Sequence, residues 1–144
     1  MKIHTLIIFA FFLACSAHGQ EEKMSKDRIG PGKAVTFASE KDGFKLSEKA
    51  NENLNIETET VEGQTVTVPR KSLVSFLDFL SVYRLRDGWY RSIEVEPTFK
   101  GDYAIFSSTE FRSGDQVVVR NGNLLRVVEL DVFGPEADAC ADGN

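Results

Sequence analysis

Histidine and cysteine are the side chains with which this sequence could most readily perform acid–base, nucleophilic or metal chemistry, and both are scarce. The two histidines, His4 and His18, lie in the first nineteen residues. Catalytic triads need a base that titrates near pH 7, and transition metals need clustered His, Cys or Met ligands. If residues 1–19 are removed as an export signal, only Cys140 and Met24 remain of these types. We therefore expect a protein that is not an enzyme and that uses no metal or cofactor.

Two further patterns resemble chemical sites but fit ordinary structure. Glu57 with Glu59, and Glu94 with Glu96, place paired carboxylates on one strand face, as glycosidases require. Alternation with other residues predicts a solvated strand face instead. Gly30-Pro31-Gly32-Lys33 lacks the leading glycine and the final Ser or Thr of a phosphate-binding loop, so it predicts a turn.

The side chains best suited to bind a partner are apolar and aromatic residues in a turn region. The run 76–80 (FLDFL) lies between predicted strands, where polar residues are usual. One interpretation is core packing, and the other is a contact patch on a partner-binding surface. The predicted protein-binding surface adds the next strand and nearby arginines, giving Phe76, Leu77, Phe79, Arg84, Arg86, Trp89, Tyr90 and Arg91.

The start of the chain predicts an export signal. Leu6–Cys15 is an apolar run of ten residues, and the small residues of Ala17-His18-Gly19 suit a signal peptidase. The run is too short to span a bilayer, which takes about twenty helical residues. We predict cleavage after Gly19 and a periplasmic or otherwise exported protein. The alternative is lipidation of Cys15, since Phe12-Leu13-Ala14-Cys15 partly matches a lipobox; the chain would then start at a membrane surface.

Composition predicts one small domain. The chain has 144 residues, 17 basic and 22 acidic, for a net charge of −5. Removal of the signal takes away Lys2, and 16 − 22 leaves −6. Residues 70–133 hold nine basic and nine acidic side chains, so the acidic excess lies in the flanks. This distribution argues against nucleic-acid binding, which favours clustered Lys and Arg.

The pattern along the chain predicts an all-β domain, a small barrel or sandwich of six to seven mostly antiparallel strands with one short helix at 47–54. Asp87-Gly88 and Asn121-Gly122 each predict a tight hairpin turn, because these dipeptides accept positive φ. We expect a signal peptide at 1–19, a flexible leader at 20–33, the domain at 34–133 and a disordered acidic tail at 134–144. Seven segments have strand character, 55–62, 65–68, 81–86, 89–95, 103–106, 116–120 and 123–130, and residues 34–46 leave open one short strand near 34–38.

A series of motifs in residues 65–133 has a familiar order and spacing. The motifs are Thr67–Val74 (TVPRKSLV), Val82–Gly88 (VYRLRDG), Ile93-Glu94-Val95, Gly114–Val119 (GDQVVV) and Asn121–Leu125 (NGNLL). In this order they resemble the membrane-proximal part of periplasmic adaptor subunits, or membrane fusion proteins (HlyD-like), of resistance-nodulation-division efflux pumps. Residues 44–61 resemble the opening segment of the heavy-metal efflux adaptors.

The resemblance implies a non-enzymatic, adaptor-like module that binds an efflux transporter or a full-length adaptor subunit of the cell envelope. The chain departs from the family in its middle. Only residues 62–65 separate Val61 from Val66, where the family has a lipoyl-like domain, usually a helical hairpin, and another barrel. The chain therefore cannot bridge two membranes alone. The alternative is an exported β-barrel that binds a small ligand or polysaccharide in an aromatic-lined cleft.

Overall fold

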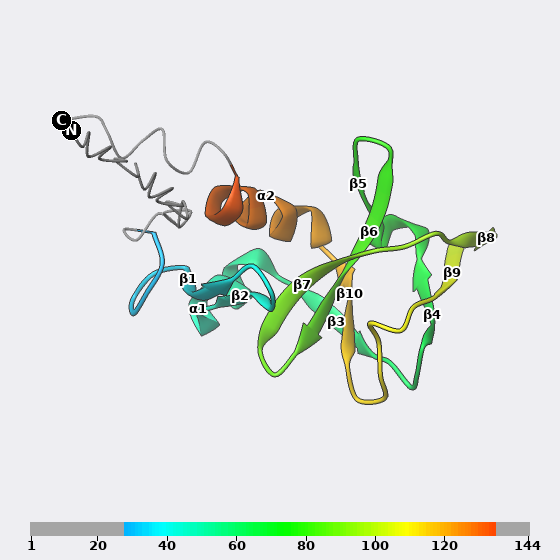
Figure 1. Cartoon of the computed structure of the whole chain (residues 1–144), viewed down its shortest axis with the longest axis horizontal. Coiled ribbons are helices and arrows are strands. Elements are labelled where there is room, and N and C mark those ends of the chain that lie inside the picture. Colours follow the sequence, from blue (N-terminus) through cyan, green and yellow to red (C-terminus); the bar gives the residue numbers. More distant parts are fainter. Residues whose placement is uncertain (1–27, 135–144) are drawn as a thin grey trace, which may run out of the picture.

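The computed structural model describes residues 28–134, which form two antiparallel sheets and two α-helices (Figure 1). The predictions for the signal peptide, Cys15, the first part of the leader and the tail from Pro135 lie outside these residues. The helices are α1 (Glu48–Leu54) and α2 (Gly122–Phe133), with a 3-10 turn η1 (Arg70–Ser72). The strands are β1 (Val35–Ser39), β2 (Gly43–Leu46), β3 (Glu57–Thr60), β4 (Thr65–Pro69), β5 (Val74–Phe76), β6 (Phe79–Arg86), β7 (Trp89–Glu94), β8 (Thr98–Lys100), β9 (Tyr103–Ser107) and β10 (Gln116–Arg120).

The larger sheet has seven strands, in the order β1-β2-β7-β6-β10-β3, and β5 also pairs with β6. The smaller sheet has the order β4-β9-β8. Neither sheet closes on itself over residues 28–134, so the predicted all-β class is confirmed in its sandwich-like form. In the same part of the chain, no helix is both long and apolar enough to cross a membrane.

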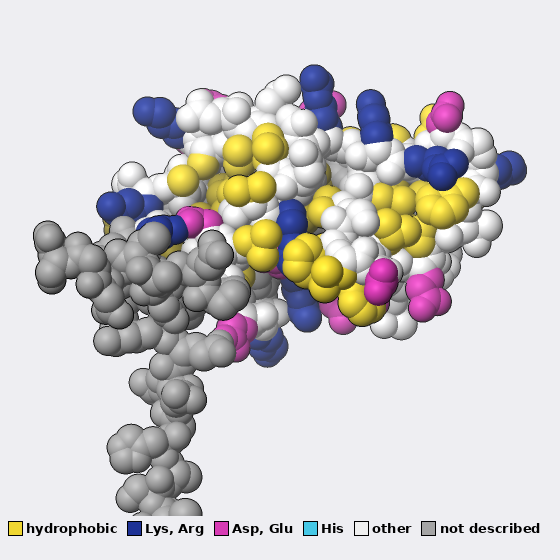
Figure 2. Space-filling view, turned by 90° about the horizontal axis from the view of Figure 1, so that it is seen from above, with side chains coloured by type: hydrophobic (Ala, Val, Ile, Leu, Met, Phe, Trp, Pro, Cys, Tyr) yellow, Lys and Arg dark blue, Asp and Glu magenta, His cyan; other side chains and the backbone are white. Residues whose placement is uncertain are grey.

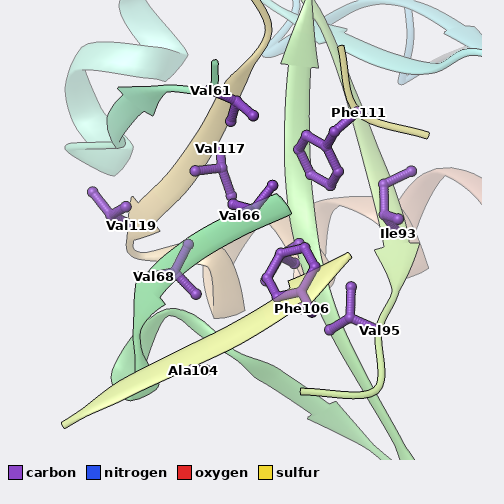
Figure 3. Close-up of a cluster of buried hydrophobic side chains, with 11 residues drawn as sticks. Val61, Val66, Val68, Ile93, Val95, Ala104, Phe106, Phe111, Val117 and Val119 are labelled. Atoms are coloured by element: carbon purple, nitrogen blue, oxygen red, sulfur yellow. The ribbon is translucent and has the colours of Figure 1, made fainter. Parts of the chain in front are cut away.

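One core fills the space between the two sheets. Figure 3 shows side chains from both sheets pointing toward one another, and the rings of Phe106 and Phe111 lie 5.9 Å apart. Alternate residues of each strand enter this core because successive side chains of a strand point to opposite faces. The buried members are Val61, Val66, Val68, Val82, Ile93, Val95, Ala104, Phe106, Phe111, Val117 and Val119.

A second core lies on the other face of the larger sheet, beneath α1 and α2. The larger sheet is therefore covered on both faces, which explains the unbroken apolar run Val117-Val118-Val119: the outer two residues face the smaller sheet, and Val118 faces the helices. The other buried members are Val35, Phe44, Leu46, Ala50, Val74, Tyr83, Tyr90, Leu125 and Val132.

The short helix α1 was predicted, and its capping is confirmed. The Ser47 hydroxyl accepts a hydrogen bond from the Ala50 N–H at 3.2 Å, and Glu48 lies in the first turn. The helix ends at Asn55, which adopts a left-handed conformation with φ of 49°.

The predicted hairpin around Asn121-Gly122 is wrong, because the chain continues from this turn into α2. Asn121 has the expected positive φ, 62°. Its side-chain amide donates to the Leu54 and Asn55 carbonyl oxygens at 2.9 and 3.0 Å, which ties the start of α2 to the end of α1. From Gly122 onward, Leu125 turns toward the sheet and is fully buried. The segment 123–130 therefore follows a helical rather than an alternating period.

The two ends of the described chain lie side by side. Arg28 forms an ion pair with Asp131 of α2. Ile29 bridges Val35 and packs against the core under the helices. Arg28 and Ile29 therefore contact the domain, and both lie within the segment 20–33 that the sequence predicted to be a flexible leader.

Candidate functional site

The two ends of strand β6 differ in the type of side chain that they carry: one end is apolar and the other is charged. Its first residue, Phe79, belongs to a hairpin with β5, and its last residue, Arg86, belongs to a hairpin with β7. Seven residue steps of about 3.3 Å separate these ends by about 23 Å. The predicted protein-binding residues therefore fall into two distant groups rather than one surface.

The β5–β6 hairpin exposes three large apolar side chains, which we call the hairpin patch: Phe76, Leu77 and Phe79. Their exposed fractions are 43%, 78% and 53%. Phe76 and Phe79 are the cross-strand pair that closes the turn, and the hairpin extends from the edge of the domain (Figure 1). The hairpin patch thus stands clear of both cores.

Leu77 occupies an unusual backbone conformation. Its φ of 52° lies in the left-handed region, which is unfavourable for a bulky side chain and is usually filled by Gly, Asn or Asp. The turn at the other end of β6 uses such residues, Asp87 and Gly88, with φ of 52° and 80°. Leu77 is therefore poorly suited to its turn and is also the most exposed large apolar residue in 28–134.

Helix α2 extends the apolar surface next to the hairpin. Leu124, Val127 and Leu130 are exposed on α2. The Arg126 guanidinium lies over the Phe76 ring, 4.1 Å from its centroid, and joins the helix to the hairpin. Figure 2 shows hydrophobic side chains gathered on the face that carries α2 and the hairpin, with charged side chains between them.

A buried tyrosine fixes the orientation of α2 on the sheet. The Tyr83 hydroxyl of β6 donates to Glu129 Oε2 at 2.6 Å, and Arg126 Nη1 donates to the same oxygen at 2.6 Å. Burial first, and then the Glu129 carboxylate, raise the pKa of Tyr83 well above its usual range, so Tyr83 stays a neutral donor. The base of the hairpin patch is therefore held by specific polar contacts.

The other end of β6 is an ion-pair network that anchors the loop before β10. Arg86 donates from Nε and Nη2 to the two oxygens of the buried Asp115, each at 2.6 Å. Arg84 Nη1 donates to the Glu110 carbonyl oxygen at 2.6 Å and lies 3.3 Å from its carboxylate. The Arg112 backbone N–H completes the set by donating to Asp115 at 2.9 Å. Arg86 thus uses Nε and Nη2 inside the domain and Arg84 uses Nη1, whereas Arg84 Nε is buried without a hydrogen-bond partner among residues 28–134.

The network shifts the pKa values of its members in directions that follow from these contacts. Burial would raise the pKa of Asp115, but the hydrogen bonds from Arg86 and Arg112 and the nearby positive charges lower it overall. The hydrogen bond with Asp115 raises the pKa of Arg86. Burial and the charge of Arg86 lower the pKa of Arg84. All these groups keep their charges at neutral pH.

The remaining predicted binding residues also lie toward the second end of β6. Tyr90 is buried and donates its hydroxyl to Asn51 Oδ1 at 2.8 Å, which makes it a core residue. Trp89 is half-buried, with Lys45 Nζ 5.0 Å from its ring centroid. Arg91 lies beside Glu110, at 3.9 Å. None of these three joins the hairpin patch.

Sequence reasoning missed Arg126 and Glu129, because it assigned their segment to a strand. Their spacing of three residues and the helical spacing of Leu125, Val128 and Val132 were the signals that could have revealed a helix with a polar pair beside its buried face. Among residues 28–134 there is no group of three or more His, Cys, Asp or Glu side chains placed to hold a metal ion.

Comparisons of the chain with protein-family models, with curated proteins and with solved structures find no match.

Proposed function

We propose that this protein is a non-enzymatic, exported adaptor-like module that docks on an envelope efflux transporter, or on a related membrane assembly, through the hairpin patch. The single observation that carries the proposal is Leu77. Its side chain is both strained in the backbone and 78% exposed. Neither property helps the isolated domain to fold, and strained residues persist mainly where function requires them.

The energetics of the patch support a macromolecular partner. Full burial of a Leu or Phe side chain is worth about 1.5–3 kcal/mol, and much of this gain is unrealised for Leu77 and Phe79 in the free domain. A partner with a matching apolar surface would recover it. The Arg126–Phe76 contact ties the turn end of the hairpin to α2, so docking requires little ordering of this region.

The alternative, an exported β-barrel that binds a small ligand or polysaccharide in an aromatic-lined cleft, has less support. It predicts an aromatic-lined cleft, whereas the exposed aromatic residues of 28–134 are divided among separate strands and Tyr90 is buried. They are Phe76 and Phe79 on the protruding β5–β6 hairpin, Phe37 on β1, Phe99 on β8 and Tyr103 on β9. A protruding apolar hairpin fits insertion into a partner better than enclosure of a sugar.

The test is a cross-linking pull-down from cell envelopes with tagged full-length protein at native abundance, followed by mass spectrometry. We expect the wild type to recover an efflux transporter or a full-length adaptor, and Leu77→Asn and Phe79→Ser to lose it. Phe37→Ser is the matched control, because Phe37 is also exposed, at 62%, but lies on the edge strand β1.

Two results would overturn the proposal. Recovery of the bait alone with several cross-linkers would remove the assembly function. Recovery of the same partner by the wild type and by both patch variants would remove the hairpin as its docking site. Circular dichroism of each variant checks that it is folded.

A further inference from the structure

A groove of about 470 Å³ opens between α2, from Arg126 to Phe133, and the surface formed by the β1–β2 turn and strand β7. This volume lies within the range of about 300–1,000 Å³ that is typical of small-ligand sites. Leu130 and Phe133 form its apolar wall, and Glu40, Ser92, Arg126 and Glu129 supply its polar side chains. The groove contains none of the three residues of the hairpin patch.

Glu129 is presented to this groove in a fixed orientation. Its Oε2 atom already accepts hydrogen bonds from Tyr83 and Arg126. Its Oε1 atom has no hydrogen-bond partner among residues 28–134. The hydrogen bonds to Oε2 fix the orientation of the carboxylate, and Oε1 remains able to accept a further hydrogen bond. Oε1 is therefore a pre-organised acceptor for a donor that enters the groove.

The side-chain charges of the groove leave one negative charge uncompensated. Glu129 is balanced by Arg126 at 2.6 Å, and Glu40 forms no ion pair within residues 28–134. Arg91, next to Ser92 on β7, also lines the groove, but its guanidinium lies 3.9 Å from the Glu110 carboxylate. Arg91 pairs across the strands with Arg84, whereas Ser92 pairs with Tyr83 and shares the helix-side face. A ligand with one positive charge would therefore complement the groove.

We propose that the groove binds a primary alkylammonium group. The ammonium donates to Glu129 Oε1 and is attracted by Glu40, and the alkyl chain packs against Leu130 and Phe133. A primary ammonium has three donors and no acceptor, which suits a site that offers carboxylate oxygens and a hydroxyl. The same chemistry occurs in free alkylamines and in the lysine side chain of another protein.

The experiment is a titration of the full-length protein with n-hexylammonium chloride, followed by NMR chemical shifts and by calorimetry. Sodium hexanoate is the probe of opposite charge and similar length. We expect saturable hexylammonium binding with shifts at Ser92, Glu129, Leu130 and Phe133, and much weaker hexanoate binding. Nα-acetyl-lysine N-methylamide distinguishes the sources: a lysine side chain of a partner is supported if it binds as well as hexylammonium, and a free amine if it binds more weakly.

Charge-neutralising variants locate the site. Glu40→Gln should weaken hexylammonium binding by about twofold to fivefold, as expected for an exposed charge. Glu129→Gln should weaken it by about tenfold or more, because Glu129 is oriented toward the ligand. Glu94→Gln is the control, since Glu94 is exposed on β7 and does not line the groove.

Three outcomes would overturn the proposal. Equal affinity for hexanoate and hexylammonium would show that charge does not select the ligand. Shifts centred on the hairpin patch would place binding elsewhere. Unchanged affinity in both Glu40→Gln and Glu129→Gln would show that the carboxylates do not contact the ammonium. None of these results affects the pull-down through the hairpin patch, so the two proposals fail independently.

Discussion

The two turns at the ends of β6 each place a residue at positive φ, but one does so with polar residues and glycine and the other with an apolar residue. The β6–β7 turn uses Asp87-Gly88, residues that accept positive φ, and the strand beside it is tied down by the Arg86–Asp115 pair. The β5–β6 turn places Leu77 at positive φ and has apolar residues on both sides. The first turn is suited to stabilise the domain, whereas the second carries strain and exposed apolar surface that the domain does not need.

The contrast between the two ends of β6 divides the predicted protein-binding residues into those that stabilise the domain and those that are free to contact a partner. Arginine and aromatic residues are both common at interfaces. Here Arg84 and Arg86 already bond to the loop before β10, and Tyr90 is buried, whereas the hairpin patch makes few contacts within the domain. Substitutions at one end of β6 should therefore change stability, and substitutions at the other end should change binding.

The largest expected effect on stability is at the Arg86 end of β6, which we call the polar end; the hairpin-patch end is the apolar end. Arg86→Ala leaves the buried Asp115 carboxylate without its main partner, so we expect the free energy of unfolding to fall by about 3–5 kcal/mol. Urea denaturation followed by circular dichroism measures this loss. Arg112→Ala, which removes a largely exposed side chain, should change stability by about 0.5 kcal/mol or less. Equal effects of the two substitutions would contradict the structural role of Arg86.

Tyr83→Phe tests the polar contact at the middle of β6. The substitution removes the hydrogen bond to Glu129 but keeps the ring in the core, so we expect a loss of about 2 kcal/mol. Glu129→Gln in the Tyr83→Phe background should then cost less than it does alone, since the two residues share one contact. Strict additivity in this double-mutant cycle would show that the hydrogen bond contributes little.

Acid should destabilise the polar end through Asp115. Its pKa is lower in the folded protein than its ordinary value of 3.8, so its contribution to stability is complete above that value. The contribution is lost as pH falls from 3.8 through the folded-state pKa, because the unfolded chain binds the proton more readily. The stability difference between wild type and Asp115→Asn should therefore shrink with falling pH in this window. A difference that is independent of pH would contradict this linkage.

The smallest expected effect on stability is at the apolar end. Leu77→Asn relieves the backbone strain, so the free energy of unfolding should rise by up to about 1 kcal/mol. We expect the same variant to bind its partner less well, which would be a gain of stability at the expense of function. Thermal unfolding measures the first change, and the pull-down measures the second. A fall in stability of more than about 1 kcal/mol would show that Leu77 contributes to the core.

Local patterns in the sequence predicted much of the fold. The cap at Ser47 defined α1, and Asp87-Gly88 defined the β6–β7 hairpin, because each depends on residues within one turn. The three-residue strands β5 and β8 were not predicted, since so short a segment shows no period. Asn121-Gly122 was misleading because its amide binds the end of α1, a contact over more than sixty residues.

The candidate site was predictable only in its apolar part. The run 76–80 stood out because apolar residues filled a turn. The roles of Arg84 and Arg86 could not be predicted, since their partners Glu110 and Asp115 lie 26 and 29 residues away and meet them only in the folded sheet. The sequence does not distinguish an arginine that forms its hydrogen bonds within the domain from one that is free to bind another protein.

The ion pair between Arg28 and Asp131 has a mechanical consequence. The chain enters and leaves the described domain at neighbouring points, and the smaller sheet lies at the opposite end of the molecule (Figure 1). Tension applied between these two points would load the Arg28–Asp131 contact first and peel α2 and β1 from the larger sheet before the sandwich separated. The same arrangement would let the domain be spliced as a cassette into a loop of another protein, with its far end left unobstructed.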